Sequence, residues 1–203
     1  VTNRGTGAVV VQPVAQINRT DRTASADTWN VHSGPFGAFD EAVTFGPNYS
    51  EVQEAPQRLV QNKGQADWLG FTDIYWMSAL IPQDGQRTTS DFRAPAPGIY
   101  LADLFYQSQS VAAGKVATRT TRLFAGAKES KVLDAYEDGG IARFGPAIDW
   151  GWFRWFERPI FLLLDKLFQM VGNFGVAIIL LTLIIRGIMF PNAQGQFASM
   201  AGL

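Results

Sequence analysis

The sequence predicts a mainly β protein, in which an antiparallel β-sandwich is followed by an amphipathic helix and one membrane-spanning helix. Residues 1–146 combine short runs of β-branched and aromatic residues with loops rich in Gly, Pro, Asn and Ser, as sandwich domains do. From residue 159 the apolar residues recur at helical spacing, and residues 174–190 are almost entirely apolar. The mean hydropathy of zero therefore averages a water-soluble part and an apolar part.

Candidate strands follow one another through the first 125 residues. Residues 8–19 are rich in Val and alternate toward their end, and Pro13 indicates a sheet edge or a bulge. Further candidates are residues 29–32, 42–45, 68–81, 98–108 and 115–125, separated by turn-rich stretches such as 33–35 and 82–85. We expect these strands to form antiparallel sheets.

One short helix is predicted in the soluble part, over residues 130–138. Val132, Leu133 and Tyr136 share a helical face there, and Gly139 and Gly140 provide a stop signal. We expect this helix to pack on the sheet or to lie near the membrane.

Residues 147–173 form the predicted interfacial segment. Its first half has the aromatic and charged composition of a membrane–water interface, with the candidate interfacial residues Trp150, Trp152, Phe153 and Trp155. From Pro159 an amphipathic helix is expected, whose apolar face comprises Ile160, Phe161, Leu163, Leu164, Leu167, Phe168 and Val171. Asp165, Lys166 and Gln169 lie opposite, so Phe161, Leu164, Leu167 and Phe168 are expected to face lipid or neighbouring helices.

Residues 174–191 are the predicted transmembrane helix. At 1.5 Å per residue, residues 174–190 span ~25 Å. This length is just enough for a thin or locally thinned bilayer, whose hydrocarbon core is usually ~30 Å thick. A helix buried in a soluble core is the alternative, but it would leave the preceding aromatic segment unexplained. Residues 192–203 are then a truncated cytoplasmic tail.

Arg186 is the candidate functional residue of this helix. A guanidinium among Ile184, Ile185, Ile188 and Met189 costs ~3 kcal/mol on insertion scales unless a polar cavity or partner receives it. The side chain can also extend to the interface beyond Pro191, as long basic side chains do near the ends of membrane helices. The sequence leaves both interpretations open.

Several classes of function are disfavoured by composition. The chain carries 17 basic and 18 acidic residues, so it lacks the positive excess that favours nucleic-acid binding. It has no cysteine and only one histidine, which makes a metal site or a thiol nucleophile improbable. The acidic pairs at residues 40–41 and 137–138 are expected to be solvated rather than catalytic. We therefore expect neither enzymatic activity nor a cofactor.

A family resemblance is carried by the C-terminal third of the chain. Residues 149–153 (Asp-Trp-Gly-Trp-Phe), 159–161 (Pro-Ile-Phe), 171–179 and 186–191 (Arg-Gly-Ile-Met-Phe-Pro) resemble bacterial YidC membrane protein insertases in order and spacing. Residues 34–37, 75–85 and 123–129 resemble parts of the large periplasmic domain of that family, more loosely. The resemblance covers nearly the whole chain.

The resemblance implies a β-supersandwich periplasmic domain, an interfacial helix and a membrane groove in the bacterial inner membrane. Its expected partners are nascent membrane proteins, the lipid bilayer and the Sec translocon, and Arg186 would contact polar or acidic parts of a substrate in the groove. Residues 192–203 lack the basic residues usual in the family. Because no signal peptide opens the chain and the expected strands begin at once, we expect a fragment that starts within a domain.

A second hypothesis comes from the sandwich alone. That architecture is shared with sugar-processing domains, so the chain could be a membrane-anchored carbohydrate-binding or mutarotase-like module. Six aromatic residues could line a sugar site, although their alternation with polar residues favours the core: Trp29, Trp68, Tyr75, Trp76, Tyr100 and Tyr106. A module of this kind needs only an anchor and has no use for an arginine within it.

Overall fold

The structure is a computed structural model that describes residues 1–25, 31–40, 42–83, 86–149 and 154–200. It divides into two compact units, Val1–Asp149 and Trp150–Leu203. We call them the β unit and the helical unit and describe each by itself.

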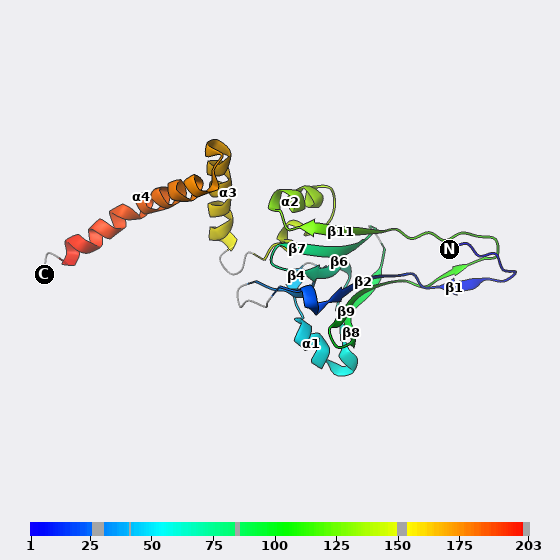
Figure 1. The fold of residues 1–203 in the computed structure, drawn as a ribbon. Coiled ribbons are helices and arrows are strands. Elements are labelled where there is room, and N and C mark those ends of the chain that lie inside the picture. Colours follow the sequence, from blue (N-terminus) through cyan, green and yellow to red (C-terminus); the bar gives the residue numbers. More distant parts are fainter. Residues whose placement is uncertain (26–30, 41, 84–85, 150–153, 201–203) are drawn as a thin grey trace. The chain divides into compact units, whose positions relative to one another are not determined.

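The described residues of the β unit form strands, two α-helices and three short 3-10 helices. Figure 1 shows how the strands and the α-helices are arranged. The strands are β1 (Val9–Val11), β2 (Val14–Thr20), β3 (Gly34–Phe39), β4 (Ala42–Phe45), β5 (Leu59–Gln61), β6 (Ala66–Thr72), β7 (Trp76–Pro82), β8 (Thr88–Ala96), β9 (Ile99–Tyr106), β10 (Gln109–Val111) and β11 (Thr121–Ala127). The α-helices are α1 (Tyr49–Glu54) and α2 (Ser130–Asp138), and the 3-10 helices are Asp21–Thr23, Pro56–Arg58 and Gly145–Ala147.

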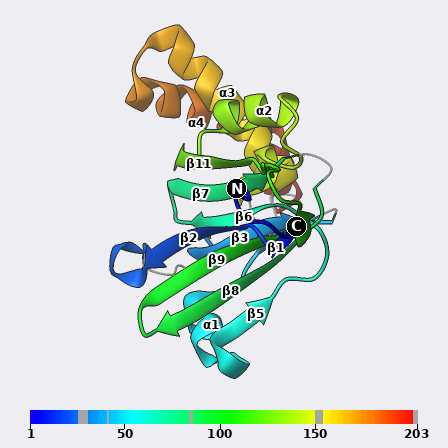
Figure 2. The ribbon, with the colours of Figure 1, turned by 90° about the vertical axis from the view of Figure 1, so that its right-hand side faces the viewer.

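Within the described residues the strands form two larger sheets and one small one. The five-stranded sheet has the order β11-β7-β6-β3-β4, and the four-stranded sheet has the order β2-β9-β8-β5. Strands β1 and β10 pair separately. All of these pairings are antiparallel, and Figure 2 shows the strands of both larger sheets from a second direction. The predicted antiparallel, mainly β class is confirmed.

Two hydrophobic clusters hold three layers together. The first lies between the two sheets and includes Phe71 of β6, Phe92 of β8 and Leu104 of β9. The second lies on the other face of the five-stranded sheet, where Trp68 packs with Leu133 of α2 and with Phe144. Because each β strand sends alternate side chains to opposite faces, the five-stranded sheet contributes to both clusters.

Strand β6 alternates irregularly because it contains a bulge. The pairing with β3 shifts between Ala38 and Phe39, so that Ala38 faces Trp68 while Phe39 faces Ala66. The extra residue, Asp67, is bonded by Arg143. The bulge lets Ala66 join the first cluster and Trp68 the second, although the two residues are an even number of positions apart.

Three sequence predictions in the β unit hold, and several others do not. Helix 130–138 is confirmed with the same bounds, residues 42–45 are a strand, and Pro13 separates β1 from the sheet-edge strand β2. Residues 68–81 were expected to form one strand but form β6 and β7, because a turn at 73–75 reverses the chain. The expectation of a single helix is also wrong, since α1 forms with Asn48 as its capping residue.

Other strand bounds differ from expectation. Residues 33–35 were expected to be a turn, yet Gly34 and Pro35 open strand β3, which is buried except at Phe39. The last strand was expected from residue 115, but β11 begins at Thr121. Strand β8 was missed because its buried positions include the polar residues Thr88 and Ser90, so its alternating burial does not appear in the sequence as an alternation of apolar and polar residues. The expected strand 29–32 lies mostly outside the described residues.

The helical unit contains α3 (Arg154–Val171) and α4 (Phe174–Met200), which contact each other. Helix α3 starts before the expected first residue, and Pro159 lies inside it. Helix α4 begins at the expected residue and continues past Pro191. Among the described residues, no helix combines the length and the hydropathy required of a membrane span.

Candidate functional site

The helical unit is a hairpin whose turn is specified by Gly172 and Asn173. Gly172 has a φ of 66°, a conformation that glycine adopts without strain, and its N–H donates to the Phe168 carbonyl at 2.8 Å. The Asn173 side chain then accepts from the Val176 N–H at 3.2 Å and caps α4. These two adjacent residues end one helix and begin the next, so α3 and α4 are kept close together at the turn.

Small and branched residues fill the contact between the two helices. Ala177 and Leu181 are the buried residues of α4 between Phe174 and Phe190, where burial is described, and they lie four positions apart on one helical face. The rings of Phe168 and Phe174 meet edge to face at 5.6 Å across the turn. Most other side chains of α4 up to Phe190 are exposed.

The predicted interfacial residues divide by exposure. Trp155 is 76% exposed, and Phe161 and Phe168 are also exposed, whereas Leu164 and Leu167 are half-buried. Trp150, Trp152 and Phe153 lie outside the described residues. The structure contains no lipid, so the contact of these side chains with a bilayer stays a prediction.

Helix α3 carries an apolar hollow near its start. Its volume is about 700 Å³, and its lining consists of Trp155, Phe156, Glu157, Ile160, Phe161 and Leu164. Glu157 is the one charged residue among the described lining residues, and the rings of Trp155 and Phe156 lie 5.8 Å apart. A surface of this composition has a chemistry suited to acyl chains or apolar helices rather than to polar ligands.

Arg186 lies on an exposed part of α4, among apolar neighbours. It is twelve residues from Phe174, which corresponds to ~18 Å along an α-helix. Ile188 and Met189 beside it are exposed as well. Within the described part of the chain no hydrogen bond or ion pair engages its guanidinium. The expected role of Arg186 in contacting substrate is not tested by this geometry.

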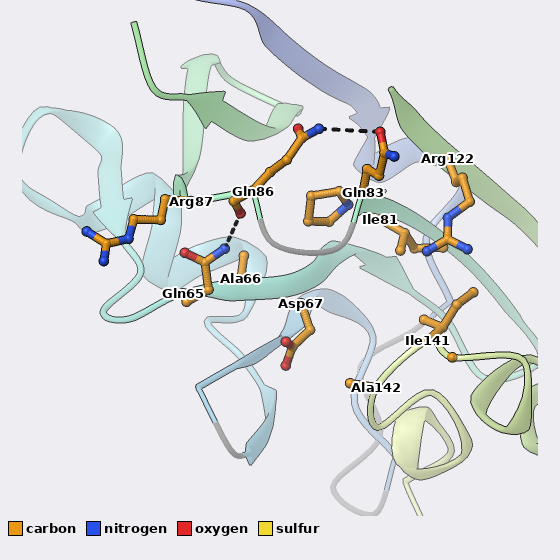
Figure 3. Close-up of a pocket in the computed structure, with 12 residues that line it drawn as sticks. Gln65, Ala66, Asp67, Ile81, Gln83, Gln86, Arg87, Arg122, Ile141 and Ala142 are labelled. Atoms are coloured by element: carbon orange, nitrogen blue, oxygen red, sulfur yellow. Dashed lines mark hydrogen bonds between the residues drawn. The ribbon is translucent and has the colours of Figure 1, made fainter. Parts of the chain in front are cut away.

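The β unit has a pocket of about 440 Å³ at the end of β7 opposite the 73–75 turn (Figure 3). Its floor is apolar and includes the buried residues Ile81 and Ile141, while Gln65, Gln83 and Gln86 provide amide groups around it. Gln65 is already bonded to the Gln86 carbonyl at 2.7 Å. The lining that the structure describes has no aromatic side chain of the kind that stacks on sugar rings.

The aromatic residues proposed for a sugar site are mostly core residues. Trp68, Tyr100 and Tyr106 are buried in the two clusters. Tyr75 and Trp76 are exposed at the turn between β6 and β7, far along β7 from the pocket, and Trp29 lies outside the described residues. No observation therefore assembles these residues into a carbohydrate-binding groove.

Neither acidic pair forms a catalytic arrangement among the described residues. The Asp40 carboxylate accepts the Gln65 N–H at 2.8 Å, and the Glu137 carboxylate accepts the Gly145 N–H at 2.7 Å, so both brace loops. Glu41 is outside the described residues, and no group of potential metal ligands occurs in the described part.

Sequence analysis missed a charged cluster on the outer face of the four-stranded sheet. Asp103 of β9 is fully buried there and is bonded by Arg93 and by the Gln16 amide at 2.6 Å. Asp91 lies opposite Asp103 on β8, and burial, reinforced by the Asp103 charge, raises the pKa of Asp91 to about 6. The alternation of charges at 91 and 93 within β8 was the available sequence signal.

Comparison with known proteins identifies relatives along the whole chain. Residues 1–163 match the family described as the YidC periplasmic domain. The chain is 41% identical over 205 residues to a membrane protein insertase YidC of Zymomonas mobilis, covering all of this chain and 35% of that protein. A protein of the same name from Mesorhizobium japonicum is 36% identical over 206 residues, covering all of this chain and 34% of the relative. The chain thus spans about a third of the length of these relatives.

Proposed function

The chain belongs to the YidC family, and we propose that it forms part of a membrane protein insertase and chaperone of the bacterial inner membrane. In this role it helps nascent membrane proteins to insert and fold, alone or together with the Sec translocon. The observation that carries the proposal is 41% identity over the whole chain to a protein named as such an insertase. No chemical reaction is required of the chain in this role.

The proposed layout assigns each part of the chain a compartment. Residues 1–146 form a periplasmic β-supersandwich domain, in agreement with the family match over residues 1–163. Residues 147–173 lie at the membrane interface, residues 174–191 cross the bilayer, and residues 192–203 are cytoplasmic. The apolar run from Phe174 to Phe190 within a continuous helix supports the crossing, because a helix satisfies its own backbone hydrogen bonds in lipid.

Helix α3 is the proposed interfacial helix. Its exposed aromatic side chains and its apolar hollow favour a position parallel to the membrane, with Leu163, Leu164, Leu167 and Phe168 facing lipid or other membrane helices. Spin labels at these four positions should be shielded from water-soluble relaxation agents, whereas a label at Asp165 should be accessible. The reverse pattern of accessibility would contradict this orientation.

Arg186 is the proposed contact for substrates. Its charge is costly in lipid unless water or polar groups reach it, and a hydrated groove formed with further helices of the insertase would provide them. Polar or acidic parts of a nascent chain could then pair with the guanidinium during insertion.

The proposal is tested with the full-length insertase that contains this chain, reconstituted into liposomes. A small single-span substrate synthesised in the presence of these liposomes should become protected from added protease, and protein-free liposomes serve as the control. Equal protection in both samples would contradict the insertase assignment.

A further inference from the structure

Two aromatic side chains stand exposed at the tip of the β6–β7 hairpin, which we define as residues 73–76. Tyr75 is 73% exposed and Trp76 is 61% exposed. The next residue, Met77, is buried. Trp68 of β6 and the two tyrosines of β9, Tyr100 and Tyr106, are buried as well. Among the other described tryptophan and tyrosine residues of the β unit, Tyr136 is 46% exposed and the rest are less exposed, so the tip carries the two most exposed rings of this kind.

The hairpin tip is held firmly in place. The Asp73 N–H donates to the Trp76 carbonyl at 2.8 Å and closes the turn. The Asp73 carboxylate is bonded by the Arg19 guanidinium and by the Ser33 hydroxyl. Asp73 is itself buried, so the turn is fixed by partners from β2 and from Ser33, the residue before β3. The exposed rings are thus presented on a rigid support.

The tip lies at the end of the β unit from which the chain continues toward α3. Trp76 pairs with Ala127 at the end of β11, and the Lys128 N–H donates to the Tyr75 carbonyl at 2.8 Å. Burial lowers the pKa of Lys128, and the nearby carboxylates of Asp149 and Asp73 oppose this shift. Asp149 is the last residue of the β unit. The hairpin tip and the end of the β unit therefore both lie close to Lys128.

The chemistry of the tip suits a lipid surface. Trp and Tyr combine an apolar ring with a polar N–H or O–H group, and both residues are enriched where membranes meet water. The segment that follows Asp149 is rich in the same residue types, and it leads into the amphipathic helix α3. Only residues 150–153 separate Asp149 from the first residue of α3 along the chain.

We propose that Tyr75 and Trp76 contact the lipid interface of the membrane, so that the β6–β7 tip is a membrane contact of the β unit in addition to the helices. This inference rests on the proposed placement of the helical unit in the inner membrane. The partner is the headgroup region of the bilayer, which accepts the indole and phenol groups while burying part of each ring.

The absence of cysteine from the chain makes a direct test possible. The variant Tyr75→Cys carries a single fluorescent label at the tip and keeps the backbone carbonyl that Lys128 bonds. The matched control is Gln83→Cys, an exposed position at the opposite end of β7, about 26 Å away along the strand. The variant Ile179→Cys reports on α4, where this side chain is exposed. Each variant of the 203-residue chain is reconstituted into phosphatidylcholine vesicles with or without brominated acyl chains.

Bromine in the vesicles should quench the label at position 75 at least twofold more than the label at position 83. Equal quenching at both positions would overturn the inference. In that case the label at position 179 shows which proposal fails. If this label is quenched, the proposed membrane helix stands and only the contact of the tip with the membrane is rejected. An unquenched label at position 179 would reject the membrane placement as well.

Discussion

Asp91 should destabilise the β unit at neutral pH, and its replacement by Asn should remove this effect. Burial raises the pKa of this carboxyl from 3.8 to about 6, and the neighbouring charge of Asp103 acts in the same direction. The folded state therefore prefers protonated Asp91. Its contribution is absent below pH 3.8, becomes increasingly unfavourable as the pH rises from 3.8 to about 6, and keeps its full unfavourable value above about 6.

The magnitude follows from the size of the shift. A change of about two pKa units corresponds to a ceiling of about 3 kcal/mol in the free energy of unfolding. Asp91 is only partly buried, and solvent screening reduces this value, so we expect about 1 kcal/mol at pH 7. The variant Asp91→Asn provides an uncharged N–H donor toward Asp103 in place of the O–H group of the protonated carboxyl, and it should be more stable than the parent by that amount.

Urea unfolding of both proteins at pH 3.5 and pH 7.5, followed by far-UV circular dichroism, measures the effect. The stability difference between variant and parent should be near zero at the lower pH and about 1 kcal/mol at the higher pH. Taking the difference cancels the titration of the other carboxylates shared by both proteins. A difference that is the same at both pH values would refute the reasoning, because it would show that the charge of Asp91 is not the cause.

Three further predictions concern Phe144, Gly70 and Arg186. Phe144 is fully buried and contacts the rings of Trp68, Phe124 and Tyr136, so Phe144→Ala should lower the free energy of unfolding by about 3–5 kcal/mol. The control Leu123→Ala, at a 65% exposed position, should change the free energy of unfolding by less than about 0.5 kcal/mol. An added Cβ at Gly70 would lie 1.9 Å from the Ser78 carbonyl oxygen, so Gly70→Ala should separate β6 from β7 and raise the rate of amide hydrogen exchange in these two strands. A Cβ added at Gly7 meets open space, so the control Gly7→Ala should leave these exchange rates unchanged. Arg186→Ala should slow insertion of substrates with acidic flanks while Arg186→Lys keeps most of the rate; normal insertion of every substrate by Arg186→Ala would indicate that the side chain only extends to the interface.

Local sequence patterns determined the classes of structure in this protein. The alternation of β-branched and aromatic residues, punctuated by Gly and Pro, was sufficient to predict antiparallel sheets over the first part of the chain. The helix at residues 130–138 and the start of α4 at Phe174 were also predictable, because helical periodicity and adjacent glycines are local signals. The motifs around residues 149–153 and 186–191 likewise identified the family.

Only the tertiary structure decided which of these residues lie in the core and which lie on the surface. Trp68 and Trp76 are eight residues apart in similar surroundings, yet Trp68 is fully buried under Phe144 and Trp76 is exposed at a turn. The bulge at Asp67 and the covering segment after α2 produce this difference, and neither is visible in the local periodicity of the sequence. The pairing of Asp91 with Asp103 likewise depends on the register of β8 with β9, which is set by contacts across the whole sheet.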